Sequence, residues 1–99
     1  MPAYLIVEHK VTDPAKFDEY VSKVRPLVAK YGARALTKTG THTVLETDHF
    51  VPDRMTVFEF PDMATLNAWY DSPEYEPLVR LRQSATDMTK DMMIAIDGA

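Results

Sequence analysis

The stretch Trp69-Tyr70-Asp71-Ser72-Pro73-Glu74-Tyr75 joins two predicted helices and places three aromatic side chains within seven residues. Asp62, which precedes it, is a good N-cap for the first helix, because its carboxylate can accept hydrogen bonds from the free N–H groups of the first turn. This helix should end near Asp71, since Ser72 precedes Pro73 and the residue before a proline is disfavoured in the α region. The stretch therefore predicts a corner between two helices.

The second helix of this corner has a less definite start. Ser72 is its candidate cap, with Pro73 at the first position, where the missing N–H is harmless. Pro77 interrupts the following turn, so regular helix is expected only beyond it. Two interpretations of the aromatic rings stay open. They form the core around the corner, or Trp69 and Tyr70 line a pocket and contact a substrate.

Composition limits the kind of protein this is. The chain has 99 residues, of which 45% are hydrophobic and 26% charged, as in an ordinary single globular domain. A net charge of −4 argues against a nucleic-acid partner, because phosphate binding needs a clustered basic surface. There is no cysteine, which removes disulfides and thiolate sites and fits the cytoplasm. The apolar run near the N-terminus is too short for a signal peptide or a membrane span.

Strands and helices are expected in the order β-α-β-β-α-β. Strands are predicted at residues 3–11, 33–39 with a continuation at 42–46, 54–60 and 92–97, and helices at 14–31 and on both sides of the corner. Asp13 or Thr12 should cap the first helix, Pro26 should kink or divide it, and Gly32 should end it. This order predicts an α+β fold, a ferredoxin-like sandwich with an antiparallel sheet, in which residues 1–99 form one domain.

Both faces of the predicted sheet are apolar. In the strand at 54–60, Phe58 and Phe60 point one way, and Met55 and Val57 point the other. A sheet covered on one side only should alternate apolar with polar residues, so the second face needs a cover. A second copy of the chain is the economical cover, and two sheets closing face to face would form a dimeric α+β barrel with a cavity between them. The face of Phe58 and Phe60 is the purer one and should pack under the helices.

Several short sequence motifs, taken together, are specific for a known family. In chain order they are Tyr31-Gly32-Ala33-Arg34, Leu45-Glu46, Arg54 with Val57-Phe58-Glu59-Phe60-Pro61, Trp69-Tyr70 with Ser72-Pro73-Glu74-Tyr75, and Leu81-Arg82 with Ala85. Because of these motifs, the chain resembles the family called domain of unknown function 1330 over nearly its whole length. It departs from that family at Ala33 and Thr47, where a glycine is usual. The resemblance implies a ferredoxin-like fold that dimerises as an α+β barrel, and it implies no established reaction.

Two carboxylates and one guanidinium are the candidate catalytic groups. Glu8 and Glu59 share a strand face with Tyr4, opposite the predicted core. We hypothesise that both point into the cavity between subunits, where a partly buried carboxylate has a raised pKa and can act as a general base. Arg34 could pair with one of them or hold an anionic ligand, and Tyr4 could contact a substrate. The alternative is an Arg–Glu pair that only stabilises the rim of the barrel.

The histidines indicate no metal site. His9 ends the first predicted strand with core-facing parity, where it is either a structural edge residue or a substrate contact. His42 and His49 lie in or near predicted turns, and the three histidines lack a ligand spacing such as H-x-H. Only three glycines are present, and none belongs to a phosphate-binding loop. We therefore expect neither a metal nor a cofactor.

Two functions remain open at this point. The first is a small-molecule enzyme without cofactor, of the monooxygenase, isomerase or lactone-cleaving type. Families with the dimeric barrel include cofactor-independent monooxygenases, haem-degrading enzymes and muconolactone-type isomerases, but a fold does not imply a function. The second is a non-catalytic dimer that binds a ligand or serves as a scaffold. An open cavity with convergent polar groups would favour ligand chemistry, and a barrel filled by side chains would favour the scaffold.

Overall fold

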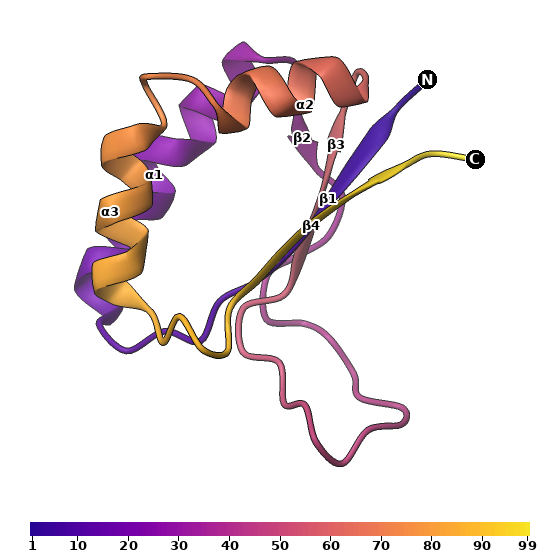
Figure 1. Cartoon of the computed structure of the whole chain (residues 1–99). Helices are drawn as coiled ribbons and strands as arrows, with labels where there is room; N and C mark the ends of the chain where they lie inside the picture. The colour runs from indigo at the N-terminus through magenta and orange to yellow at the C-terminus, as the bar shows by residue number, and fades with distance from the viewer.

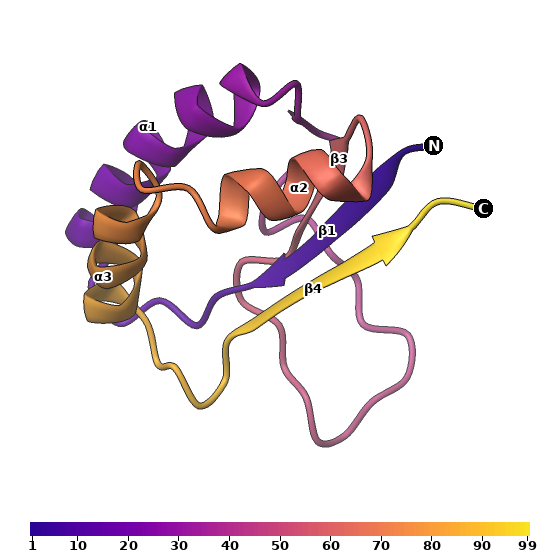
Figure 2. The ribbon, with the colours of Figure 1, turned by 45° about the horizontal axis from the view of Figure 1, so that its top comes forward.

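A computed structural model describes all residues from Met1 to Ala99 and shows one sheet covered by helices on one face (Figures 1 and 2). The elements are β1 (Ala3–Glu8), α1 (Pro14–Lys30), β2 (Arg34–Ala35), β3 (Thr56–Phe60), α2 (Met63–Tyr70), α3 (Glu76–Ala85) and β4 (Met92–Asp97). The sheet order is β2-β3-β1-β4, and every neighbouring pair is antiparallel. The predicted α+β ferredoxin-like order is confirmed, with the last helical unit divided into α2 and α3. None of the helices has the length and apolarity that crossing a bilayer requires.

The ends of the first two helices follow the sequence signals. The Asp13 carboxylate accepts a hydrogen bond from the backbone N–H of Lys16 at 3.1 Å, and α1 begins at Pro14. Gly32, with a φ of 78°, ends α1 in the left-handed conformation that glycine adopts without strain. Asp62 accepts from the N–H of Thr65 at 2.7 Å and caps α2. The prediction that Pro26 could divide the first helix is wrong, because α1 runs through it.

The corner between α2 and α3 is closed by Ser72. Its hydroxyl donates to the carbonyl of Trp69 at 2.8 Å and accepts from the N–H of Tyr75 at 3.3 Å. Ser72 therefore caps a turn and not a helix, because α3 begins later, at Glu76. Pro77 lies in the first turn of α3, where its missing N–H leaves no bond unmade.

The long central strand predicted from residue 33 onward does not form. β2 contains only two residues, and residues 36–55 make a loop that extends beyond the sheet (Figure 1). Side-chain hydrogen bonds replace the ladder here. The N–H of Val57 donates to the Thr37 hydroxyl at 2.9 Å, and the hydroxyls of Thr39 and Thr56 lie 2.6 Å apart. Gly40 then turns the chain away with a φ of 80°. For this reason β3 starts at residue 56, two residues later than predicted.

The two sheet faces differ in their cover. The helix-covered face carries Leu5, Val7 and Phe60, which are all buried, as the prediction for the purer face requires. On the other face the register places a row of apolar side chains across three strands, because Ile6 pairs with both Val57 and Ile94. A neighbouring row places Tyr4 beside Glu59 and Ile96. No helix of this chain covers that second face (Figure 1).

Candidate functional site

A cavity of about 200 Å³ lies between α1 and the helix-covered face of the sheet. Its wall is mainly apolar, with Leu5, Val7 and Met93 from the sheet and Val21, Val24 and Val28 from α1. We call it the α1 cavity. The volume is small for a ligand site, and it suits a molecule with a single ring or a short chain. The cavity belongs to one chain and lies on the face opposite to the predicted inter-sheet cavity.

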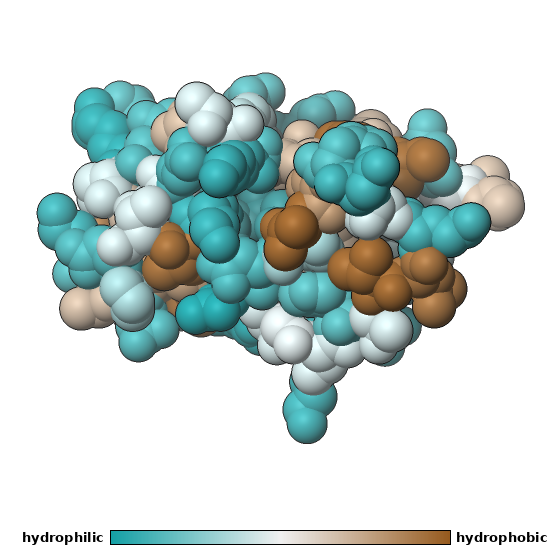
Figure 3. All heavy atoms as spheres, turned by 90° about the horizontal axis from the view of Figure 1, so that it is seen from below, coloured by the Kyte–Doolittle hydropathy of each residue, from teal (hydrophilic) through white to brown (hydrophobic).

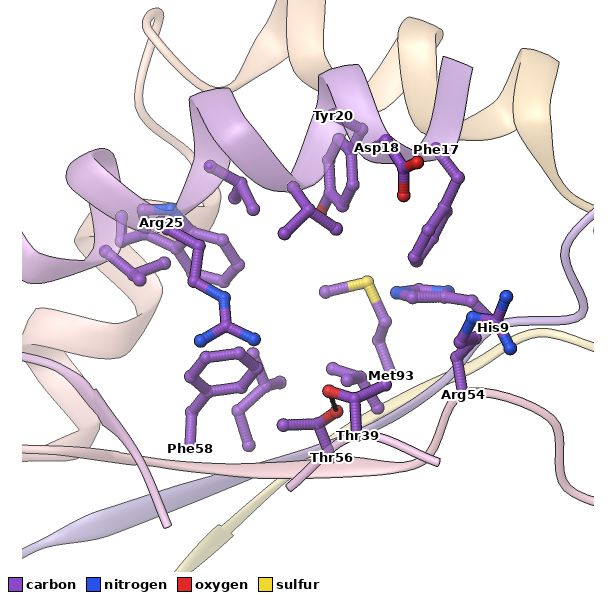
Figure 4. Close-up of a pocket in the computed structure, with 16 residues that line it drawn as sticks. His9, Phe17, Asp18, Tyr20, Arg25, Thr39, Arg54, Thr56, Phe58 and Met93 are labelled. Atoms are coloured by element: carbon purple, nitrogen blue, oxygen red, sulfur yellow. Dashed lines mark hydrogen bonds between the residues drawn. The ribbon is translucent and has the colours of Figure 1, made fainter. Parts of the chain in front are cut away.

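Polar side chains are few and stand around the cavity at separate places (Figure 4). His9 enters from the end of β1, and the hydrogen-bonded hydroxyls of Thr39 and Thr56 lie on the sheet side. The charged side chains in the wall are Asp18, Arg25 and Arg54. Few polar groups in an apolar wall are typical of sites that orient a small organic ligand.

His9 is held by aromatic neighbours on the helix side of the sheet. Its ring contacts Phe17 edge-on at 5.6 Å between centroids and Tyr20 at 6.3 Å. Its Nδ1 lies 3.4 Å from Oδ2 of Asp91 and makes no hydrogen bond of good geometry. The two nitrogens of an imidazole point in nearly opposite directions, so Nε2 points away from Asp91. No side chain or backbone group of the chain is hydrogen-bonded to Nε2.

Asp91 is a buried carboxylate that ties three segments together. Its Oδ1 accepts from the backbone N–H of Lys10 at 2.9 Å, and its Oδ2 accepts from the Thr86 hydroxyl at 2.6 Å. The guanidinium of Arg82, also buried, lies 4.0 Å from Oδ2. A buried carboxylate needs such donors and a countercharge to stay ionised. Asp91 is therefore a fixed negative charge behind His9.

Burial favours the neutral forms of one histidine and two tyrosines at this end of the cavity. Burial lowers the pKa of His9 below its usual 6.5, and the Asp91 charge only partly opposes this effect. Burial likewise raises the pKa of Tyr20 far above its usual value, and it raises the pKa of Tyr75. The two phenol groups are hydrogen-bonded to each other at 2.8 Å. At neutral pH the cavity wall therefore contains the neutral imidazole of His9 and the neutral phenol of Tyr20, and the neutral phenol of Tyr75 is hydrogen-bonded to Tyr20.

A neutral imidazole in an apolar wall can accept a proton. If Nδ1 carries the hydrogen, it faces Asp91, and the lone pair of Nε2 is left for a ligand. The Asp91 carboxylate would then stabilise the imidazolium that forms. The Nδ1–Oδ2 distance of 3.4 Å is long for a hydrogen bond, but such contacts often shorten when a ligand binds.

The residues singled out from the sequence fall into separate places. His9 and Trp69 line the α1 cavity, whereas Tyr70 lies outside it, about half exposed at the helix corner. Glu59 and Arg34 are paired at 3.4 Å on the uncovered face, as the register of β2 and β3 requires. Tyr4 pairs with Glu59 across the strands of that face. Whether a second chain closes a cavity over these three residues stays a prediction.

Glu8 is separated from the other candidate catalytic groups. It is buried, and its two carboxylate oxygens accept from the backbone N–H groups of Asp53 at 2.6 Å and Arg54 at 2.9 Å. Its carboxylate thus closes the end of the loop formed by residues 36–55. Within this chain both oxygens are used for structure.

Replacing Glu8 by alanine is expected to lower the free energy of unfolding by about 2–4 kcal/mol, because two partly buried N–H groups lose a charged acceptor. Hydrogen exchange at the amides of Asp53 and Arg54 should become faster, and urea unfolding should give the lost stability. The matched control is Glu59→Ala, which removes a carboxylate paired only with the exposed Arg34 and should change stability by less than about 1 kcal/mol. Equal losses in the two variants would contradict this assignment.

Three of the site groups carried no signal that sequence reasoning could use. Asp91 accepts a hydrogen bond from the backbone N–H of Lys10, which lies 81 positions earlier in the chain. Only the pairing of β1 with β4 brings these two residues together. In the sequence, Arg25 and Arg82 look like ordinary charged residues on solvent-exposed helix faces, yet Arg82 is buried. The usable indications are the parity of His9, which places its ring under the helices, and the aromatic corner, which offers Trp69 as a lining residue.

Solved structures share this fold at low sequence identity. A protein of unknown function from Rhodopseudomonas palustris has a TM-score of 0.83 at 15% identity, over 99% of this chain and 82% of that one. A dimeric ferredoxin-like protein of unknown function from Jannaschia sp. CCS1 has a TM-score of 0.73 at 11% identity, over 99% and 100%. SnoaB, a cofactor-independent oxygenase from Streptomyces nogalater, has a TM-score of 0.63 at 13% identity, over 99% and 93%. These similarities show the fold alone.

Sequence comparison gives the family. No curated protein sequence matches the chain. The family model described as domain of unknown function (DUF1330) matches residues 2–99, in agreement with the sequence motifs around the helix corner. The match spans nearly the whole chain, so the chain belongs to the DUF1330 family.

Proposed function

We propose that this protein binds a small, largely apolar organic molecule in the α1 cavity and removes a proton from it with His9. The observation that carries the proposal is a buried imidazole in an apolar cavity wall, with Asp91 on one side of the ring and no partner on Nε2. Lowering of the His9 pKa by burial supports it, because the imidazole is then neutral and able to act as a base at neutral pH.

The chemistry of this step is a simple proton transfer. A C–H or O–H bond of the ligand breaks, its electron pair stays on the ligand, and the proton moves to Nε2 of His9. The resulting imidazolium is stabilised by the Asp91 carboxylate near Nδ1. A carbanion or phenolate formed in this way is the common starting point for isomerisation, lactone chemistry and oxygenation without a cofactor. The structural likeness to SnoaB, at 13% identity, is compatible with these chemistries and selects none of them.

A non-catalytic binding protein is the second candidate. The observation that favours it is the state of Asp91, whose two oxygens already accept hydrogen bonds from Lys10 and Thr86. On this interpretation the carboxylate serves the fold and His9 merely fills the wall. Both candidates share the ligand cavity, and they differ only in proton transfer.

The proposal includes a homodimer in the cytoplasm. The uncovered apolar face of the sheet supports a second copy, and structural neighbours from three organisms are described as dimeric. The lack of cysteine supports the compartment. In such a dimer Glu59, Arg34 and Tyr4 would lie at the interface between the sheets. There the ion pair of Arg34 with Glu59 supplies structure, and the α1 cavity supplies the ligand site.

Proton transfer can be tested without knowing the complete reaction. We expect the protein to catalyse exchange of acidic C–H hydrogens with deuterium in a panel of lactones and 1,3-diketones, followed by NMR. Replacing His9 by glutamine should slow this exchange by about 100-fold or more, the usual contribution of a positioned base. Because burial lowers the His9 pKa, the rate should stay level from pH 8 to 6.5 and fall only in more acidic solution.

The matched control is His42→Gln, which removes a histidine from the exposed loop and should leave the rate unchanged. Circular dichroism should show that both variants are folded. If members of the panel bind and none exchanges faster than in buffer, the protein is a binding module and the catalytic proposal is wrong. If the His9 variant retains full exchange, another group is the base.

A further inference from the structure

Arg25 presents a cation without an ionic partner at one end of the α1 cavity. Its guanidinium carbon lies 5.8 Å from the ring centroid of Phe58, close enough for a cation–π contact. The side chain is exposed, lines the cavity, and forms no ion pair with any carboxylate of the chain. In Figure 4 it descends from α1 at one side of the cavity, and its guanidinium ends above the ring of Phe58.

The other charges around the cavity leave Arg25 as the free cation. Arg54 lies at the His9 end (Figure 4) and is paired with Asp53 at 3.2 Å. Asp18 is seven positions before Arg25 on α1, so the two share a helix face at a separation of about 10 Å. An anionic group is therefore attracted to the Arg25 end and repelled from the Asp18 end. This arrangement would orient a ligand that carries one negative charge.

We propose that the ligand of the α1 cavity is a small organic acid whose carboxylate is held by Arg25 above Phe58. The Arg25 guanidinium lies near the ring and has no carboxylate partner in the chain, so two of its N–H groups can be donated to the two oxygens of a carboxylate. The apolar body of the acid would lie among the apolar side chains of the wall, which include Val21, Val24 and Met93.

The position of His9 also limits which hydrogen of the ligand it can remove. Arg25 and His9 stand at opposite ends of the cavity (Figure 4). The acidic hydrogen that His9 removes would thus be separated from the carboxylate by the body of the molecule, and it would not be on the carbon next to the carboxylate. This inference rests on the proposed function, because it assumes that the α1 cavity is the ligand site.

Phenylacetate and phenylacetamide are suitable probes, since they differ chiefly in charge. Trp69 is the only tryptophan and lines the cavity, so its fluorescence, checked by calorimetry, reports binding. We expect phenylacetate to bind about tenfold more tightly than the amide, as one charged hydrogen-bonded contact allows. Arg25→Gln should abolish this preference and leave amide binding unchanged. Added salt should reduce the preference in the wild-type protein.

Lys23→Gln is the matched control, because it removes one positive charge from the same helix at a position paired with Glu19 and outside the cavity. This variant should keep the full preference for phenylacetate. Equal binding of the two probes to the wild-type protein, or an unchanged preference in Arg25→Gln, would overturn the acid assignment and leave the cavity as a ligand site. Failure of both probes to bind at millimolar concentration would overturn the acid assignment and the binding site together.

Discussion

Replacing Trp69 by alanine is expected to lower the free energy of unfolding by about 3–5 kcal/mol, a large share of the stability of a chain of this size. The indole is 1% exposed and lies between Phe60, at 5.4 Å between ring centroids, and Tyr75, at 4.4 Å. Removing it takes apolar surface from both neighbours and enlarges the α1 cavity, which Trp69 also lines. Because α2, β3 and the corner that precedes α3 all meet at this ring, the loss should affect the whole fold.

Urea unfolding followed by far-ultraviolet circular dichroism is the appropriate measurement, since the substitution removes the only tryptophan fluorophore. The matched control is Trp69→Phe, which keeps a ring against Phe60 and Tyr75 and should lose about half as much stability or less. Tyr70→Ala is a second control from the same helix, at a side chain that is 47% exposed. A loss below about 1 kcal/mol in Trp69→Ala would contradict a central role for this ring.

The aromatic corner shows why much of the fold could be predicted from the sequence. The signals that set the helix ends are local. Asp62 caps α2 at this corner, and Gly32 ends α1 elsewhere in the chain, each through bonds to residues within a few positions. The last strand, predicted at 92–97, forms at Met92–Asp97 because its apolar run has no competing turn signal. Local chemistry of this kind does not depend on the rest of the chain.

The failures concern bonds between distant segments. The predicted strand at 33–39 shortens to Arg34–Ala35 because threonine hydroxyls take the place of backbone partners on β3. Glu8 has the face parity of a cavity carboxylate, yet the loop end at Asp53 returns to it and occupies both oxygens. Neither outcome is contained in periodicity, because each requires knowing where a loop of twenty residues returns.

The location of the cavity follows the same rule. Sequence parity correctly placed His9 on the helix side and Glu59 on the opposite side, but it gave no reason for space to remain under α1. That space depends on side-chain volumes at the facing positions of α1 and the sheet, where valines leave room that larger residues would fill. Cavities are differences in packing, so they appear only when the elements are assembled in three dimensions.

The uncovered sheet face carries the second large prediction. Ile94 and Ile96 are 48% and 54% exposed, and Ile94 stands in line with Ile6 and Val57 across the strands. Seen from below, apolar side chains gather toward the side of the molecule where both termini lie (Figure 3). A continuous apolar row on a sheet face is unusual for a surface that stays in contact with water.

Replacing Ile94 by aspartate is therefore expected to convert a dimer into a monomer at micromolar concentration. In a symmetric dimer the substitution would bury two carboxylates in the apolar contact, a penalty of about 3 kcal/mol or more, which exceeds a hundredfold in the dissociation constant. Light scattering during gel filtration, or native mass spectrometry, measures the change.

Met88→Asp is the matched control, because Met88 is 49% exposed but lies in the connection between α3 and β4, away from the sheet face. It should remain dimeric, and circular dichroism should show that both variants keep the fold. A monomeric wild-type protein would mean that the face stays uncovered, and a dimeric Ile94→Asp variant would mean that the dimer uses another face. In either case Glu59 and Arg34 form a surface ion pair only.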